Sequence, residues 1–214
     1  MNKTTPDIDQ LITCLRDELE PVAPLSSPAV RAMQWFFGGL IAIIIVGALV
    51  SYRPDLDTKI TELSFIGEIA LILMIAGSAA YASAWLSLPD GGWHKQVVIL
   101  PYILIMVAMI IAAREMLIHG FQVPVFDLKE CIIDATFMGI IPIGMIIWMM
   151  RSGAPTYPAL AVSVNMIAAG SMGYLGLRLS CGSDEIGHIC VYHVMPFVVV
   201  GLALGLVARR LYRW

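Results

Sequence analysis

Many of the side chains in this sequence that could do chemistry lie in one short stretch near the C-terminus. The stretch CGSDEIGHICVYH, residues 181–193, holds two cysteines, two histidines and two acids between almost purely apolar segments. Cys181, His188, Cys190 and His193 together would offer the thiolate and imidazole ligands that suit zinc or another soft or borderline metal ion. Cys190 and His193 are three residues apart and would share one face of an α-helix. The alternatives are a disulfide or thiol switch, and a plain polar turn.

Membrane-spanning helices must position these groups. Of the 214 residues, 59% are hydrophobic and only 14% are charged, whereas a soluble domain carries about 25% charged residues. Six apolar stretches are long enough, at about 20 residues each, to cross a bilayer as helices. They are residues 32–50, 66–88, 97–113, 131–150, 157–179 and 189–208. We therefore predict an all-α membrane protein in which residues 32–214 form a six-helix transmembrane bundle.

The basic residues predict the orientation of this bundle. If the N-terminus is cytoplasmic, most of the 13 Lys and Arg lie on the cytoplasmic side, including those of the terminal ARRLYRW, as the positive-inside rule requires. Both termini are then cytoplasmic, and Cys131, Cys181 and Cys190 lie at the outer face. In a bacterium that face meets the periplasm, where disulfides persist. His193 lies one turn inside the last span, and an ionisable residue in a span is a candidate functional residue.

Residues 1–31 are predicted to form a short amphipathic helix and a Pro-rich linker on the cytoplasmic side. The polar face of this helix is acidic, so anionic lipid headgroups would not favour it. A partner protein that takes the helix in a groove is the preferred interpretation; docking on the protein's own loops, or on membrane lipid, are the alternatives. The apolar stripe that would make the contact consists of Ile8, Leu11, Ile12, Leu15 and Leu19.

Several function classes find no support in the sequence. It contains no P-loop, no HExxH motif and no Ser-His-Asp set on one face, and we predict that the protein is not an enzyme. No cofactor is expected beyond a transient soft metal ion, and a net charge of −3 does not favour direct contact with nucleic acid. The rival interpretation is a membrane redox protein or a small-solute carrier built on the same bundle.

A series of short motifs gives the chain a family resemblance. The motifs are Arg178 with Cys181, the acidic pair Asp184 and Glu185, the aromatic–His pair Tyr192 and His193, and Arg213 with Trp214. Together with the N-terminal helix, the Pro-rich linker, an RPDL segment after the first span and a cysteine opening the fourth span, their order resembles that of the NrsF-type membrane anti-sigma factors. These are negative regulators of extracytoplasmic-function sigma factors.

The resemblance implies a function and a pair of sensing residues. The N-terminal helix would bind the sigma factor and keep it from RNA polymerase, and the protein would lie in a bacterial inner membrane. Cys131 and Cys181, with His193 nearby, would sense heavy metal or oxidant and release the sigma factor. This sequence has Gly182 where the family often has Pro and Tyr192 where it often has Trp. Cys190 is not part of the family pattern.

Overall fold

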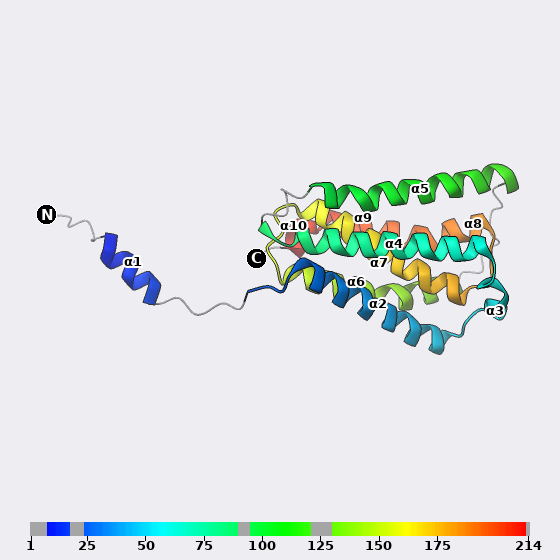
Figure 1. Cartoon of the computed structure of the whole chain (residues 1–214), viewed down its shortest axis with the longest axis horizontal. Helices are drawn as coiled ribbons and strands as arrows, with labels where there is room; N and C mark the ends of the chain where they lie inside the picture. Colours follow the sequence, from blue (N-terminus) through cyan, green and yellow to red (C-terminus); the bar gives the residue numbers. More distant parts are fainter. Residues whose placement is uncertain (1–7, 18–23, 90–94, 121–129, 213–214) are drawn as a thin grey trace.

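The computed structural model of the protein describes residues 8–17, 24–89, 95–120 and 130–212. Six of the helices in this part of the chain are long and apolar enough to cross a membrane, so the predicted all-α architecture with six spans is confirmed (Figure 1). The spans are α2 (Pro28–Val50), α4 (Leu63–Leu86), α5 (Lys95–His119), α6 (Glu130–Arg151), α7 (Pro158–Ser180) and a composite last span. The last span joins α8 (Ile186–His188), the π-helix η2 (Ile189–Val194) and α9 (Met195–Leu206). The shorter helices are α1 (Ile8–Asp17), α3 (Leu56–Lys59) and α10 (Ala208–Leu211).

The first span begins at a standard helix start signal. The Ser27 side chain accepts a hydrogen bond from the backbone N–H of Val30 at 3.4 Å, and Pro28 occupies the first helical position, where its missing N–H costs nothing. The helix ends at Val50, and the next residue, Ser51, has a positive φ of 89°. The span thus takes in residues 28–31, although the functional division of the chain at residue 31 stays a prediction.

The fifth span, α7, lies at the centre of the bundle and packs against α2, α4, α6 and α9. Of the residues in the most apolar stretch of α7, 72% are buried, which is the largest share among the six spans. In α5, which runs along one edge of the bundle, the corresponding share is 11% (Figure 1). Small residues allow this close packing, because helices in lipid associate through van der Waals contact rather than through exclusion of water. The Phe197 ring of α9 lies over Gly170 and Gly173, and a Cβ on Gly173 would come within 2.2 Å of that ring.

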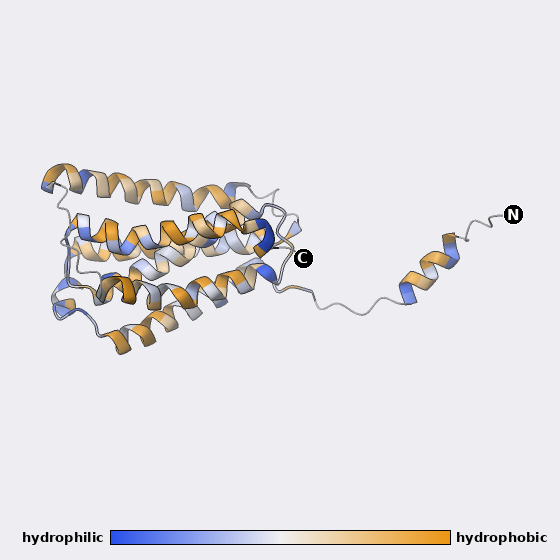
Figure 2. Cartoon of the chain, turned by 180° about the vertical axis from the view of Figure 1, so that it is seen from behind, coloured by the Kyte–Doolittle hydropathy of each residue, from blue (hydrophilic) through white to orange (hydrophobic). Residues whose placement is uncertain are grey.

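Polar residues gather at the two ends of the bundle, and the length between them is mainly hydrophobic (Figure 2). We call one end the cysteine end, where α2 and α7 finish and where α4, α6 and α8 begin. The other is the Arg31 end. There the buried Arg31 side chain donates hydrogen bonds to the Ser87 hydroxyl, to the Met149 carbonyl and, at 3.1 Å, to the Ser152 hydroxyl.

Candidate functional site at the cysteine end

Four potential metal ligands converge at the cysteine end of the bundle. One ligand atom from each of Cys131, Cys181, His188 and His193 lies within 4.8 Å of the others. Cys131 comes from the first turn of α6, Cys181 directly follows α7, His188 ends α8, and His193 lies in the π-helix. The structure therefore joins residues from one loop and three helices into one group, which we call the Cys–His cluster.

The distances within the Cys–His cluster fit a tetrahedral metal site. The sulfur atoms of Cys131 and Cys181 are 3.8 Å apart, and the Nε2 atom of His188 lies 3.4 Å from the first and 3.3 Å from the second. In a tetrahedral zinc site the sulfur ligands lie about 2.3 Å from the ion and the nitrogen ligands about 2.0–2.1 Å from it. Two sulfur ligands are then about 3.8 Å apart, and a sulfur and a nitrogen ligand are about 3.6 Å apart. Cys131, Cys181 and His188 are thus spaced to hold such an ion, and the fourth ligand, His193, lies within 4.8 Å of each of them.

The histidine of the last span has an unusual environment. The His193 side chain is 0% exposed, and within the described part of the chain neither ring nitrogen has a hydrogen-bond partner. Its ring packs against Tyr174 and His188, with centroids 5.9 and 5.4 Å away. Buried polar groups are nearly always hydrogen-bonded, and each exception needs an explanation. A metal ion bound among the neighbouring thiols would satisfy one of these nitrogens.

The π-helix explains why the ligand set differs from the predicted one. We expected Cys190 to join His193, since residues three apart share a face of an α-helix. In a π-helix, however, hydrogen bonds link residues five apart, so the wider turn brings His188 and His193 together and rotates Cys190 away from His193. Cys190 is absent from the group of converging ligands, and Cys131 takes its place. The converging group thus differs from the predicted metal set in this one member, and metal binding itself stays a prediction.

The environment of Cys181 favours the reactive thiolate form of its side chain. The pKa of its thiol lies well below the usual range, because the Cys131 thiol hydrogen-bonds to it. Burial acts in the opposite direction, while the nearby His193 ring and the backbone N–H of Ser183, 3.5 Å from the sulfur, favour the thiolate. The thiolate is the form of cysteine that binds metals and attacks oxidants or disulfides. No disulfide joins the described cysteines, so metal binding and disulfide formation are both chemically open to Cys131 and Cys181.

A network of ion pairs surrounds the loop between Cys181 and His188. The carboxylate of Asp184 in this loop contacts Arg53 at 3.1 Å, Lys59 at 2.9 Å and Arg178 at 3.0 Å. Burial would raise the pKa of Asp184, but these three cations hold it well below its usual range. The loop that supplies two of the four ligands is thereby tied to the segment after α2 and to the end of α7.

The same network continues across α4. The Arg178 guanidinium contacts Glu68 at 2.8 Å, and the Tyr174 hydroxyl donates a hydrogen bond to that carboxylate at 2.5 Å. Phe65 lies under both Arg53 and Arg178, whose guanidinium carbons are 5.7 and 5.4 Å from the centre of its ring, a geometry that favours cation–π attraction. Sequence reasoning missed these pairings; the signal available was the clustering of Arg, Lys and acids in the short links at this end.

The N-terminal helix shows the predicted amphipathic stripe. None of its residues is buried, and the four described residues of the stripe, Ile8, Leu11, Ile12 and Leu15, are 51–71% exposed. Leu19, the fifth predicted contact, lies outside the described residues. The structure leaves the apolar face of α1 uncovered, and its role in binding stays a prediction.

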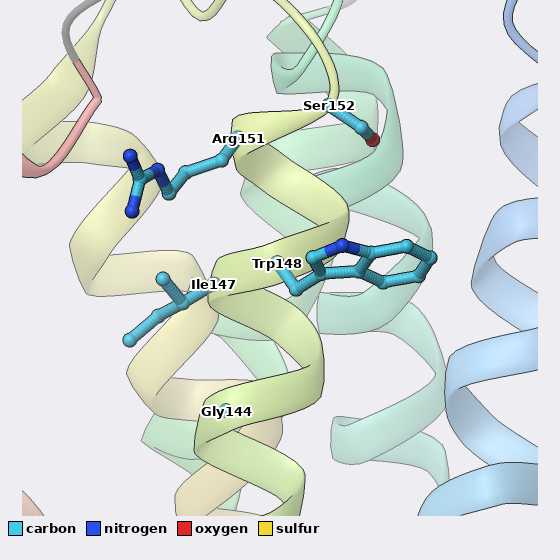
Figure 3. A pocket seen from close by; sticks show the side chains of 5 residues that line it. All are labelled: Gly144, Ile147, Trp148, Arg151 and Ser152. Carbon is cyan, nitrogen blue, oxygen red and sulfur yellow. The ribbon is translucent and has the colours of Figure 1, made fainter.

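A shallow hollow of about 440 Å³ lies at the opposite end of the bundle (Figure 3). It is lined by five residues around the last turns of α6: Gly144, Ile147, Trp148, Arg151 and Ser152. Figure 3 shows the Trp148 and Arg151 side chains pointing to opposite sides of the helix. The lining brings together no group of titratable side chains, so the Cys–His cluster is the better candidate for a chemical site.

The fold and the cluster define a multi-pass helical membrane protein with an amphipathic helix ahead of its first span. Residues 15–214 match the family described as negative regulator of sigma F, NrsF. A curated relative from Caulobacter vibrioides (strain NA1000 / CB15N), the anti-sigma-F factor NrsF, is 24% identical over 217 residues, which cover 96% of this chain and 99% of the relative. No solved structure matches the chain. The chain belongs to the NrsF family of anti-sigma factors, a class of regulators that act negatively on sigma factors.

Proposed function

We propose that this protein is an anti-sigma factor of a bacterial inner membrane, with both termini in the cytoplasm, and that it sequesters an extracytoplasmic-function sigma factor through α1. Release follows when a soft metal ion or an oxidant reacts with the Cys–His cluster on the other side of the membrane. The observation that carries the sensing part of the proposal is the convergence of Cys131, Cys181, His188 and His193, whose ligand atoms lie within 4.8 Å of one another.

The uncovered face of α1 supports the partner-binding part. A ten-residue helix is marginal in water on its own, and this one presents four large apolar side chains, each at least half exposed. The acids Asp9 and Asp17 of the same helix disfavour anionic lipid as the cover. An apolar groove of a partner protein suits such a face, and a sigma factor is the partner that membership of the NrsF family suggests.

Metal binding and oxidation to a disulfide are the two reactions proposed for the cluster, and they use different residues. A metal ion would draw on all four ligands, because soft and borderline ions favour a mixed thiolate and imidazole set. An oxidant would join only the sulfurs of Cys131 and Cys181, now 3.8 Å apart. Replacement of His193 therefore separates the two: it weakens the response to metal and leaves the response to oxidant intact.

The proposal is tested in cells that carry a reporter for the sigma factor captured by the membrane-embedded full-length protein. Cys131→Ser and Cys181→Ser should each abolish the response to added metal or oxidant, and the double variant should behave like either single variant because the two thiols act as one unit. Cys190→Ser is the matched control and should respond normally. Failure to capture any sigma factor would refute the binding part, and additive effects of the two cysteine variants would refute the joint sensor.

The orientation has its own test. A maleimide that does not cross membranes should label an outer-face cysteine in intact spheroplasts and leave Cys14 unlabelled until the membrane is opened. Labelling of Cys14 in intact spheroplasts would place α1 on the wrong side for a cytoplasmic partner.

A further inference from the structure

The segment that directly follows α2 is bonded to the loop of the Cys–His cluster, and the other end of α2 is joined to α1 by the linker. Arg53 follows α2 by three residues, and its side chain is fully buried. Its guanidinium contacts Asp184 through Nη1 at 3.1 Å and Nη2 at 3.2 Å. Its backbone N–H donates to the Leu179 carbonyl at 3.0 Å. Both links reach the segment that surrounds Cys181.

Asp184 is the point at which the links converge. It lies between two ligands of the cluster, Cys181 and His188, and its carboxylate also accepts hydrogen bonds or ion pairs from Lys59 and Arg178. A two-pronged contact between a guanidinium and a carboxylate fixes distance and orientation together. Any shift of the loop backbone between Cys181 and His188 must therefore either carry Arg53 with it or break this contact.

The opposite end of the same helix is also held by a buried arginine. Arg31, in the first turn of α2, bonds to Ser87 just after α4 and to Met149 and Ser152 around the end of α6. The chain that precedes this turn is the linker to α1. Since α6 begins beside Cys131, α2 and α6 both run from the cluster to the place where the linker enters the bundle.

We propose that the Arg53–Asp184 contact is the positioning link through which a reaction at the Cys–His cluster moves α2 and, with it, the linker to α1. This inference rests on the proposed function, because it assigns the route between the sensing site and the sigma-binding helix. Asp184 and Arg53 touch neither the metal nor the sigma factor in this scheme. They convert a displacement of the Cys181–His188 loop into a displacement of α2.

The test compares Asp184→Asn with Asp55→Asn in the full-length protein. Both changes remove one carboxylate partner of Arg53, since Asp55 contacts it at 2.7 and 2.9 Å, but only Asp184 lies in the cluster loop. Three quantities are measured: protein abundance in the membrane, protection of Cys131 and Cys181 from a maleimide after addition of cadmium, and the ratio of reporter expression with and without cadmium. Asp184→Glu, which keeps the carboxylate, is a rescue variant.

We expect Asp184→Asn to keep the thiol protection of the wild type while its reporter ratio falls to about one. Asp55→Asn should keep the wild-type ratio, and Asp184→Glu should restore part of it. If Asp184→Asn does not accumulate, Arg53→Lys answers the same question, because a lysine keeps the charge but cannot make the two-pronged contact.

A wild-type reporter ratio in Asp184→Asn, or in a stable Arg53→Lys, would overturn the inference. So would loss of thiol protection along with the ratio, because Asp184 would then only shape the cluster. An equal loss in Asp55→Asn would likewise count against a specific link to the loop. A wild-type protein that represses the reporter but never responds to cadmium or oxidant would instead refute the sensing part of the proposed function.

Discussion

The sharpest test of the proposed sigma-binding surface is the change Leu15→Asp in α1. Leu15 is 55% exposed, so a covering partner can remove about half of its apolar surface from water, which corresponds to about 1 kcal/mol of the roughly 1.5–3 kcal/mol for complete burial of such a side chain. The substitution loses this contact and also places a carboxylate in an apolar groove, where desolvation of an ion costs several kcal/mol. A total of about 3 kcal/mol or more corresponds to a loss of affinity of roughly a hundredfold.

The assay titrates the captured sigma factor against the full-length protein in lipid nanodiscs, with the cellular reporter as a second readout. Gln10→Asp is the matched control, because it adds the same charge on the opposite face of α1; we expect a change of less than about threefold, as for an exposed position outside the contact. Leu15→Asp should also leave the reporter constitutively on at normal protein abundance. Undiminished affinity in Leu15→Asp, or an equal loss in Gln10→Asp, would refute the assignment of the apolar stripe as the contact surface.

Three further predictions concern the cluster and the core. His193→Gln should weaken zinc or cadmium binding at least about tenfold in a competition titration, since it removes a proposed ligand, whereas Cys190→Ser should bind normally. Equal effects of the two changes would contradict the ligand set formed by the Cys–His cluster. Because the pKa of Cys181 is lowered, its thiolate persists as the pH falls, and its alkylation rate should change less than about twofold between about pH 8 and about pH 6. The rate for an unperturbed cysteine of pKa about 8.5 falls roughly 80-fold over the same range. A fall of that size for Cys181 would refute the lowered pKa. Gly173→Ala should destabilise the bundle by about 1–3 kcal/mol through overpacking, measured by thermal aggregation in detergent, and Gly205→Ala, where a Cβ meets nothing within 4 Å, should not.

The spans were the most predictable part of the structure. A lipid environment forces long apolar runs into helices, and breakers such as Pro28 mark where such a run can begin, so composition and length sufficed. The exact ends of the helices could not be predicted as well: α5 continues to His119, beyond the apolar run that ends near residue 113.

The Cys–His cluster was predictable only in part. The sequence supplied three of its four members from one stretch, and the family resemblance supplied Cys131. The inclusion of Cys190 followed from an α-helical period that the last span does not have at that point. The contact between Arg53 and Asp184 joins two links that are 131 residues apart, and charge patterns within single links do not indicate which links meet.

The π-helix of the last span has a consequence for how much length variation such a site tolerates. A π-helical turn accommodates one residue more than the α-helical turn it replaces, so His188 and His193, five residues apart, lie on one side of the helix. Deletion of a single residue between them would give a regular α-helix in which the two histidines, then four residues apart, still share one face, and the apolar residues that follow, including Phe197, would keep their register. Among relatives, a one-residue gap at this position should therefore coincide with the same ligand set where the cysteines and histidines themselves are retained.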